Sequence, residues 1–532
     1  MTSYISRLSP VPGFADYTGP HKVGTIDVEI PVSELDPPSA RTAPGDDIPT
    51  IQYRIFYPCE PDAKGKPVNW IPRPQRDYIS AYSRFLGAGS TLAEFISYFP
   101  RLLHYVTIPV RKDAPLLQPN TSNKRWPVMV FSHGLGGSRN AYSHLVGSIA
   151  SHGMIVIAPE HRDGSTPISY IREPPTNDST SEKHHKKKHA RTVDYIKLSH
   201  TPSPEVEEGR NAQLKIRLWE MGLIHDSLLK LDEGKSITNL NASSTSLSIF
   251  KDRMNVHEPG KIAYAGHSFG AATIVQFVKS VFYASETSSA PSSYKPLFIP
   301  SSRSAVCQQI TPQNPIILLD CWCFPLRSAS TRWLWNRPLP CYAPGGPGGS
   351  AIVAVESQAF FKWTEHLKAT KRLLSANPAS STPSPMGKSP PHFYYPATSA
   401  HLSQSDFGVL FPWVTKRVFA AEEPERIMRL NVRAILQLLR ERGIEVSKTS
   451  SEDMELEVGE DEETNDDKKI FGKDGAVRGW IWLDIYDGQL AGSDSDSESE
   501  LEEHELKKEP NEAVMGNEVQ ATTGGLGGES KI

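Results

Sequence analysis

Short apolar segments separated by glycine and polar turns recur through the middle of this chain. Five of them have the length of a buried strand, and they cover residues 128–131, 154–158, 262–265, 316–319 and 351–355. Other segments repeat their apolar side chains at helical spacing, and they cover residues 140–152, 214–231, 271–282, 361–374 and 426–442. Continuously apolar strands that alternate with helices predict an α/β fold with a mostly parallel, doubly wound sheet and helices on both faces.

Two further segments carry a different pattern. Residues 51–57 alternate polar with apolar side chains, which predicts a half-exposed antiparallel strand. Residues 84–110 are dense in large apolar side chains and contain few charges. They predict a helix that either covers the core as a lid or makes peripheral contact with a membrane surface.

Three segments are polar, charged or rich in proline and serine, and cannot bury enough apolar surface to offset the entropy lost on ordering. They are residues 173–208, residues 375–391 and the chain after residue 449. The sequence therefore predicts one α/β domain over 1–448 with two disordered insertions, followed by an acidic, mostly disordered tail over 449–532. An apolar island at 477–486 interrupts the tail and either docks on the domain or binds a partner.

The net charge of −4 hides an uneven distribution of charge along the 532 residues. Acidic side chains gather at 452–467 and 494–509, so the rest of the chain is basic. Several of the basic residues lie in the first predicted insertion, which indicates a solvated loop, and we expect no nucleic acid as a partner. His184, His185 and His189 lie among these lysines, where we expect no metal site.

Five scattered cysteines provide no disulfide framework and favour a reducing compartment. The first residues lack the basic and apolar regions of a secretory signal, and no apolar run is long enough to span a bilayer. These features predict a cytoplasmic location, with the protein soluble or peripheral on membranes. The sequence does not indicate an oligomeric state.

One stretch of the chain carries a specific chemical signal. The apolar strand at 262–265 runs into Gly266-His267-Ser268-Phe269-Gly270, and a helix of small residues begins directly after it. The two glycines allow a tight, strained turn that raises the serine hydroxyl clear of the sheet at a helix N-terminus. This context makes Ser268 a candidate nucleophile.

A serine nucleophile needs a base to take its proton and an acid to orient that base, in the chain order serine, acid, histidine. Asp320 ends the apolar strand at 316–319 and is the best candidate acid. Two histidines further along the chain, His392 and His401, are both acceptable bases on position alone, with His401 favoured because it lies in a loop of small residues. His366 falls on the helix at 361–374, and His504 falls in the acidic tail.

The reaction also needs backbone N–H groups aimed at the developing oxyanion. The residue after the nucleophile, Phe269, supplies one. The other is expected from a glycine-rich loop after an earlier strand, and residues 131–137, which read FSHGLGG, fit that requirement.

Several of these blocks resemble the platelet-activating factor acetylhydrolases, which are calcium-independent phospholipid esterases with the α/β-hydrolase fold. The strongest similarity lies in residues 131–165, 264–273, 318–326 and 399–407, and a weaker similarity lies in residues 19–30, 53–58 and 70–74. The resemblance implies that Ser268 is the nucleophile, Asp320 the acid and His401 the base. It implies an oxyanion hole made by the backbone amides of Leu135 and Phe269, and a supporting role for the polar run at 160–163.

The resemblance implies hydrolysis of a short or oxidised sn-2 acyl ester of a glycerophospholipid through an acyl-enzyme, with no metal and no cofactor. Two alternatives remain at this point. One is a general carboxylesterase or lipase of the same fold, and the other is a catalytically silent scaffold that binds a partner. Cys321 and Cys323 lack partner ligands in the sequence and are expected to be packing residues.

Overall fold

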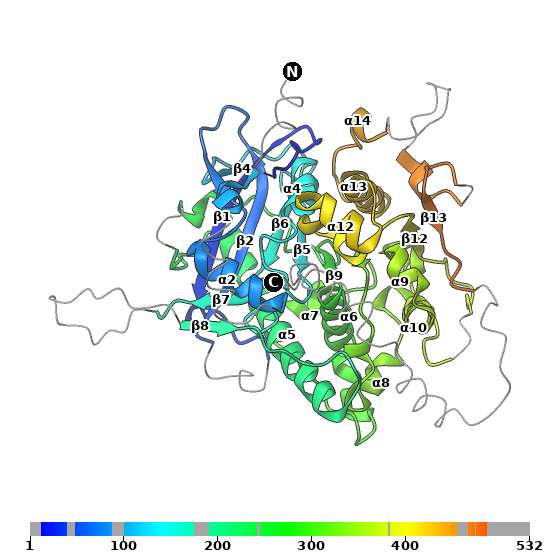
Figure 1. Cartoon of the computed structure of the whole chain (residues 1–532). Helices are drawn as coiled ribbons and strands as arrows, with labels where there is room; N and C mark the ends of the chain where they lie inside the picture. Colours follow the sequence, from blue (N-terminus) through cyan, green and yellow to red (C-terminus); the bar gives the residue numbers. More distant parts are fainter. Residues whose placement is uncertain are drawn as a thin grey trace, which may run out of the picture.

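The computed structural model describes residues 12–39, 48–87, 101–174, 191–241, 245–380, 384–454, 467–473 and 475–486. An 11-stranded sheet forms the centre of the molecule, in the order β13-β12-β11-β10-β9-β5-β6-β2-β1-β4-β3 (Figure 1). The strands in this sheet are β1 (Lys22–Pro31), β2 (Thr50–Cys59), β3 (Lys66–Asn69), β4 (Thr107–Lys112), β5 (Val128–Ser132), β6 (Ile155–Pro159), β9 (Ala263–His267), β10 (Ile316–Leu319), β11 (Ile352–Val355), β12 (His392–Pro396) and β13 (Trp480–Trp482). A separate two-stranded sheet pairs β7 (Ile168–Ile171) with β8 (Arg191–Asp194).

Neighbouring strands are parallel from β6 through β5, β9, β10 and β11 to β12. The pairs β1–β2, β2–β6 and β12–β13 are antiparallel. The order from β1 to β12, with one antiparallel strand near the start and a long parallel centre, is that of an α/β hydrolase. The predicted fold class is confirmed by this topology.

Helices cover both faces of the sheet. They are α2 (Gln75–Phe85), α4 (Ser143–Ser151), α5 (Pro204–Asp232), α6 (Phe269–Phe282), α7 (Val306–Gln309), α8 (Arg332–Trp335), α9 (Gln358–Lys362), α10 (Thr364–Leu374), α11 (Asp406–Leu410), α12 (Pro412–Phe419), α13 (Pro424–Glu441) and α14 (Ser451–Met454). Apolar side chains of α5 and α6 join one buried cluster, and those of α4 and α13 join the other. In Figure 1, α4 and α13 lie together in the upper part of the molecule, while α5 and α6 lie below.

The five predicted core strands occur within a residue or two of their expected ends. The predicted strand at 51–57 is antiparallel, as expected, but it is not half-exposed, because all ten residues of β2 are buried. Its polar side chains find internal partners: the Arg54 guanidinium donates hydrogen bonds of 2.9 and 2.6 Å to the carboxylate of Asp27 on β1. The polar positions of this strand therefore resemble an exposed face in the sequence, although Arg54 is buried in an ion pair with Asp27.

Two predicted helices differ from those observed. The helix expected over 361–374 is interrupted at Trp363, which separates α9 from α10. In the segment 84–110, residues 88–100 lie outside the described part of the chain, and residues 107–112 form strand β4 rather than helix. Among the described residues, no helix is both long enough and apolar enough to cross a membrane.

Parts of both predicted insertions are ordered elements of the domain. Residues 175–190 and 381–383 lie outside the described residues. Residues 191–194 form β8, and α5 begins at Pro204 with the Ser203 hydroxyl accepting a hydrogen bond from the Val206 N–H. In the second insertion the Ser389 carbonyl accepts the Gly349 N–H at 2.8 Å, which attaches this loop to the body.

The apolar island of the tail docks on the domain, which is one of the two alternatives that the sequence left open. Residues 480–482 form β13 and pair antiparallel with β12, at the edge of the sheet on the right of Figure 1. Ile470, Val477 and Trp480 are buried in the same cluster as α4 and α13. The predicted boundary at 448/449 therefore does not separate body from tail, because residues 480–482 extend the sheet and Ile470, Val477 and Trp480 join its core.

We expect Trp480→Ala to destabilise the whole domain. The Trp480 ring stacks on Tyr394 with a centroid distance of 5.2 Å, and its indole N–H donates to the Ile470 carbonyl at 2.9 Å. Removing a buried Trp side chain costs about 3–5 kcal/mol in unfolding free energy. The neighbouring Ile481 is 39% exposed, so Ile481→Ala on the same strand is the control and should cost less than about 1 kcal/mol. Denaturant unfolding followed by fluorescence and circular dichroism measures both, and equal effects of the two variants would show that the island contributes no core.

Candidate active site

Ser268 occupies a strained turn between β9 and α6. Its backbone angles are φ 56° and ψ −121°, a conformation that non-glycine residues rarely adopt. The two flanking glycines are required by close approach: a Cβ on Gly266 would lie 2.5 Å from the Gly270 carbonyl carbon, and a Cβ on Gly270 would lie 2.0 Å from the Ser132 oxygen. The turn therefore holds the Ser268 side chain at the carboxyl edge of the sheet, with the N-terminus of α6 behind it.

Asp320 follows β10 at the same edge and is 0% exposed. Its N–H donates to the Val355 carbonyl at 2.8 Å, and its Oδ1 accepts a short hydrogen bond from the Ser357 N–H. These contacts tie Asp320 to the end of the neighbouring strand β11. The other carboxylate oxygen is left to face the loop that follows β12.

His401 lies in that loop, at the start of the 3₁₀ turn His401–Gln404, and its Nδ1 is 2.9 Å from Asp320 Oδ2. The imidazole stacks on Phe360 with a centroid distance of 4.6 Å and an interplanar angle of 4°. An Asp406 carboxylate five residues later accepts the N–H groups of Ser143 and His144 at the start of α4, both at 2.9 Å. The histidine is thus held by a carboxylate, a ring and an anchored loop.

A second imidazole, which the sequence pattern did not single out, lies beside His401. His267, the residue before the serine, has its ring centroid 4.4 Å from that of His401, and its Nε2 lies 4.0 Å from Asp320 Oδ2. Ser268 is 1% exposed, and its hydroxyl has no hydrogen-bond partner among the described residues. The structure brings Asp320 and His401 into direct contact, while the Ser268 hydroxyl is not hydrogen bonded to the ring. In unliganded hydrolases this contact commonly tightens only when substrate binds.

The other histidines considered from the sequence lie elsewhere. His392 begins β12, stacks on Phe471 with a centroid distance of 3.7 Å, and has its Nε2 3.6 Å from Glu441. His366 lies on α10, and its Nε2 accepts the Cys323 N–H at 3.2 Å. Of the two bases that position left open, only His401 contacts Asp320.

The loop after β5 reaches the serine turn. A Cβ on Gly134 would lie 3.0 Å from the Ser268 Cβ, which shows how closely this loop approaches the turn. The Gly134 N–H donates to the Tyr142 hydroxyl at 3.1 Å, and that hydroxyl lies 2.8 Å from His267 Nδ1. In the described part of the chain, neither the Leu135 N–H nor the Phe269 N–H, which lies in the first turn of α6, has a protein acceptor. Their expected role as the two donors of an oxyanion hole stays a prediction.

The polar run at 160–163 forms a buried network behind the loop. Asp163 Oδ2 accepts a 2.7 Å hydrogen bond from Arg217 Nε, and an Arg217 Nη1–H donates to the His133 carbonyl at 2.8 Å. His161 Nδ1 lies 2.7 Å from Glu220 Oε2. Burial lowers the pKa of His161 and raises the pKa of Glu220 to about 8, so both shifts disfavour the charged forms of this pair.

Aromatic rings extend from the first residue of α6. The Phe269 and Trp322 centroids are 6.1 Å apart, and Trp322 contacts His200 at 5.7 Å. The Arg210 guanidinium lies 5.1 Å from the Trp322 ring centroid. His200 belongs to the segment predicted to be a disordered insertion, which instead packs beside the acid-bearing loop.

Among the described residues, one cluster of side chains has the makings of a metal site. It consists of His267, Asp320 and His401, whose potential ligand atoms lie within 4.8 Å of one another. Two of the three candidate donors, His401 Nδ1 and Asp320 Oδ2, are hydrogen bonded to each other, and His267 Nδ1 is occupied by Tyr142. The expectation of a site without metal or cofactor stays a prediction. Cys321 and Cys323 are buried free thiols beside this group.

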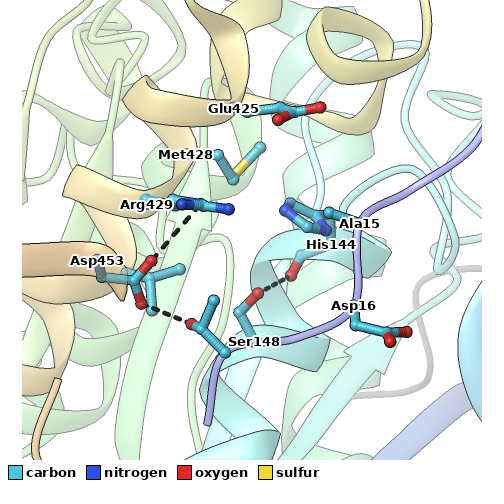
Figure 2. Close-up of a pocket in the computed structure, with 10 residues that line it drawn as sticks. Ala15, Asp16, His144, Ser148, Glu425, Met428, Arg429 and Asp453 are labelled. Carbon is cyan, nitrogen blue, oxygen red and sulfur yellow. Dashed lines mark hydrogen bonds and ion pairs between the residues drawn. The ribbon is translucent and has the colours of Figure 1, made fainter. Parts of the chain in front are cut away.

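A small cavity lies apart from this group and is lined by the N-terminal segment, α4, α13 and α14 (Figure 2). Asp453 accepts a hydrogen bond from Thr18 at 2.5 Å and lies 3.5 Å from Arg429 Nε. None of Ser268, Asp320 or His401 lines it. The cavity belongs to the packing of the N-terminal segment on α4.

Comparison with known proteins identifies the family of this chain. The sequence model for the family described as platelet-activating factor acetylhydrolase, isoform II, matches residues 8–339. The chain is 28% identical over 453 residues to a putative phospholipase A2 from Schizosaccharomyces pombe, an alignment that covers 81% of this chain and 92% of the relative.

It is 32% identical over 223 residues to platelet-activating factor acetylhydrolase from Canis lupus familiaris, covering 42% of this chain and 45% of the relative, so this match spans less than half of the canine protein. A ferulic acid esterase from Streptomyces cinnamoneus aligns with a TM-score of 0.43 at 13% identity, covering 81% of this chain and 92% of the esterase. The family match covers more than half of the chain and includes the serine turn, the loop at 131–137 and Asp320. This chain belongs to the platelet-activating factor acetylhydrolase, isoform II, family.

Proposed function

We propose that this protein is a calcium-independent serine esterase that hydrolyses the short or oxidised sn-2 acyl ester of glycerophospholipids. Its membership of a lipid-ester hydrolase family supports the general reaction. The observation that carries the assignment of residues is the 2.9 Å contact between Asp320 and His401, at the sheet edge that also presents the strained Ser268 turn. The names of its relatives, an acetylhydrolase and a phospholipase A2, support the substrate class.

In the proposed first step the Ser268 oxygen attacks the acyl carbonyl carbon, and His401 Nε2 takes the hydroxyl proton. Asp320 accepts the Nδ1–H of His401, fixes its tautomer and stabilises the imidazolium that forms. The N–H groups of Leu135 and Phe269 bind the oxygen that becomes negative. When the tetrahedral intermediate collapses, the lysophospholipid alkoxide takes the proton from His401 and leaves an acyl-enzyme, which water hydrolyses by the same steps.

The electrostatic surroundings favour this use of His401. Burial first, and then the charge of His401, lowers the pKa of His267 well below its ordinary value. His267 is therefore neutral at pH 7 and does not oppose the imidazolium with a permanent charge. Ser268, Asp320 and His401 are 1%, 0% and 7% exposed, and in such a water-poor site hydrogen bonds to the oxyanion are stronger than in water.

Two alternatives are distinguishable. A general carboxylesterase or lipase would use the same groups and differ only in the acyl chain that it accepts. A silent scaffold would not need the strained serine, the Asp320–His401 contact and two unoccupied N–H groups together, and for this reason we favour the enzyme. The proposal includes a cytoplasmic location with peripheral contact to membranes, since the substrate lies there.

We expect Ser268→Ala to lose at least about 10³-fold in ester hydrolysis, because the nucleophile itself is removed. The variant should also lose covalent labelling by a fluorophosphonate probe, read by mass spectrometry of the peptide that contains residue 268. Ser280→Ala, a buried serine on the same helix, is the matched control and should be labelled normally. Labelling that persists in Ser268→Ala would assign the nucleophile elsewhere.

We expect Asp320→Asn and His401→Ala each to lower kcat by about 10³–10⁴-fold, while His392→Ala stays within about threefold of wild type. The reason is that Asp320 and His401 contact each other, whereas His392 packs against Phe471 outside the site. Initial rates on a soluble aryl acetate measure this. A large loss in His392→Ala with little loss in His401→Ala would reverse the assignment of the base.

We expect acetyl and oxidatively truncated phosphatidylcholines to be hydrolysed faster than a long-chain analogue, and at the same rate with or without a calcium chelator. Acid release from vesicles of each lipid, followed by titration or mass spectrometry, gives the comparison. Preference for the long chain would favour the general lipase, and loss of activity with the chelator would contradict the metal-free mechanism.

A further inference from the structure

A second buried carboxyl group lies beside the proposed catalytic acid. Asp320 follows β10 and Glu356 follows β11, and these strands are parallel with Leu319 opposite Val355. The Asp320 N–H donates to the Val355 carbonyl, and the Glu356 N–H donates to the Tyr394 carbonyl at 2.9 Å. Asp320 and Glu356 therefore occupy neighbouring positions, each directly after one of two adjacent strands, and both side chains are buried.

Glu356 has no basic partner. Among the described residues, no lysine or arginine forms an ion pair with it, and its Oε2 has no hydrogen-bond partner. The groups that face the pair come from four elements: Cys321 and Cys323 after β10, His366 and Thr370 on α10, His401 in its loop and His267 before the serine. Lys279 of α6 lies beyond the cysteines, where burial lowers its pKa to about 7.

Two carboxyl groups that are buried at the ends of neighbouring strands disfavour the presence of two negative charges. An unpaired buried charge is strongly unfavourable, and a neighbouring like charge adds to that cost. Burial first, then Asp320 and Cys323, raises the pKa of Glu356 well above its ordinary value. Ser357 and His401 both donate hydrogen bonds to Asp320, whereas Glu356 Oε2 has no hydrogen-bond partner among the described residues. Glu356 is therefore the member of the pair that lacks support for a negative charge.

We propose that Glu356 is a positioning residue for the reaction, whose carboxylic acid donates a hydrogen bond to the Asp320 carboxylate and so tunes the basicity of His401. The proposal rests on the assignment of Asp320 and His401 given above. Ser357 and His401 already donate to Asp320, and the proposed donor from Glu356 withdraws further negative charge from it. With less charge on Asp320 the imidazolium is stabilised less, so this third donor makes His401 a weaker base than it would be in a simple acid–histidine pair.

The test compares Glu356→Gln, whose amide still donates but does not ionise, with Glu356→Leu, which has a similar volume and no donor. The pH profile of kcat/KM is measured on a soluble aryl acetate. We expect the acid limb of Glu356→Gln to stay within about 0.2 pH units of wild type and that of Glu356→Leu to move upward by about 0.5–1 unit. Glu365→Gln, at a half-buried position of α10 where Glu365 pairs with Lys368 at 3.0 Å, is the control and should match wild type.

A second readout does not depend on activity or on the Leu variant folding. A raised native pKa means that Glu356 contributes stability that is fully present below its ordinary value of 4.5 and is lost as the pH rises through the native pKa. The unfolding free energy of wild type should therefore fall at alkaline pH more than that of Glu356→Gln.

Two results would overturn the proposal: an acid limb in Glu356→Leu that coincides with wild type, or identical alkaline stability of wild type and Glu356→Gln. Neither result affects the assignment of the nucleophile, which is judged by fluorophosphonate labelling of Ser268. Conversely, normal labelling of Ser268→Ala would defeat the proposed function while leaving the alkaline stability of the Glu356 variants unchanged.

Discussion

The parallel sheet imposes the constraint on which the site depends, because it sends the carboxyl ends of β9, β10, β11 and β12 to one edge. Ser268, Asp320, Glu356 and the His401 loop follow these strands in that order, across more than a hundred residues of chain. The hydrogen bond between Asp320 and His401 spans 81 positions and closes the arrangement. The serine turn needs no such closure, because the glycines on either side and the helix behind it are local features of the sequence.

This difference explains what the sequence could predict. Ser268 and Phe269 follow from a local pattern, and Asp320 follows from a strand end, so each could be identified without knowing the fold. His401 could not be separated from His392 by position, since the choice depends on where strand β12 begins: His392 is its first residue, whereas His401 lies in the loop that follows it. The resemblance to a family made the choice, and the structure places His401 against Asp320 and His392 against Phe471.

Several of the errors share one physical cause, which is that polar residues in this protein are often internal. The alternation in β2 looked like exposure, but Arg54 is buried and paired with Asp27. The segment around residue 200 looked like a solvated insertion, yet His200 packs on Trp322. Glu356 carried no signal at all, because a lone glutamate after an apolar strand is ordinary until the neighbouring strand is known to end in aspartate. The composition of a segment indicates only its average environment, whereas the burial of these polar side chains depends on a single partner that lies far away in the sequence.

Residues of the predicted tail help to hold the loop that carries His401. The Gly479 carbonyl accepts the Ala397 N–H at 2.7 Å, four residues before His401, and the Arg478 carbonyl accepts a short hydrogen bond from Arg426 at the start of α13. Gln358 binds the same loop from the other side, since its N–H donates to the Ser399 hydroxyl at 2.8 Å. The histidine loop is thus held between α9, α13 and a strand contributed from beyond the acidic stretch. A catalytic base must be placed to within a fraction of an ångström, and residues 467–473 and 475–486 help to hold the loop of the proposed base, although their composition resembles that of a tail.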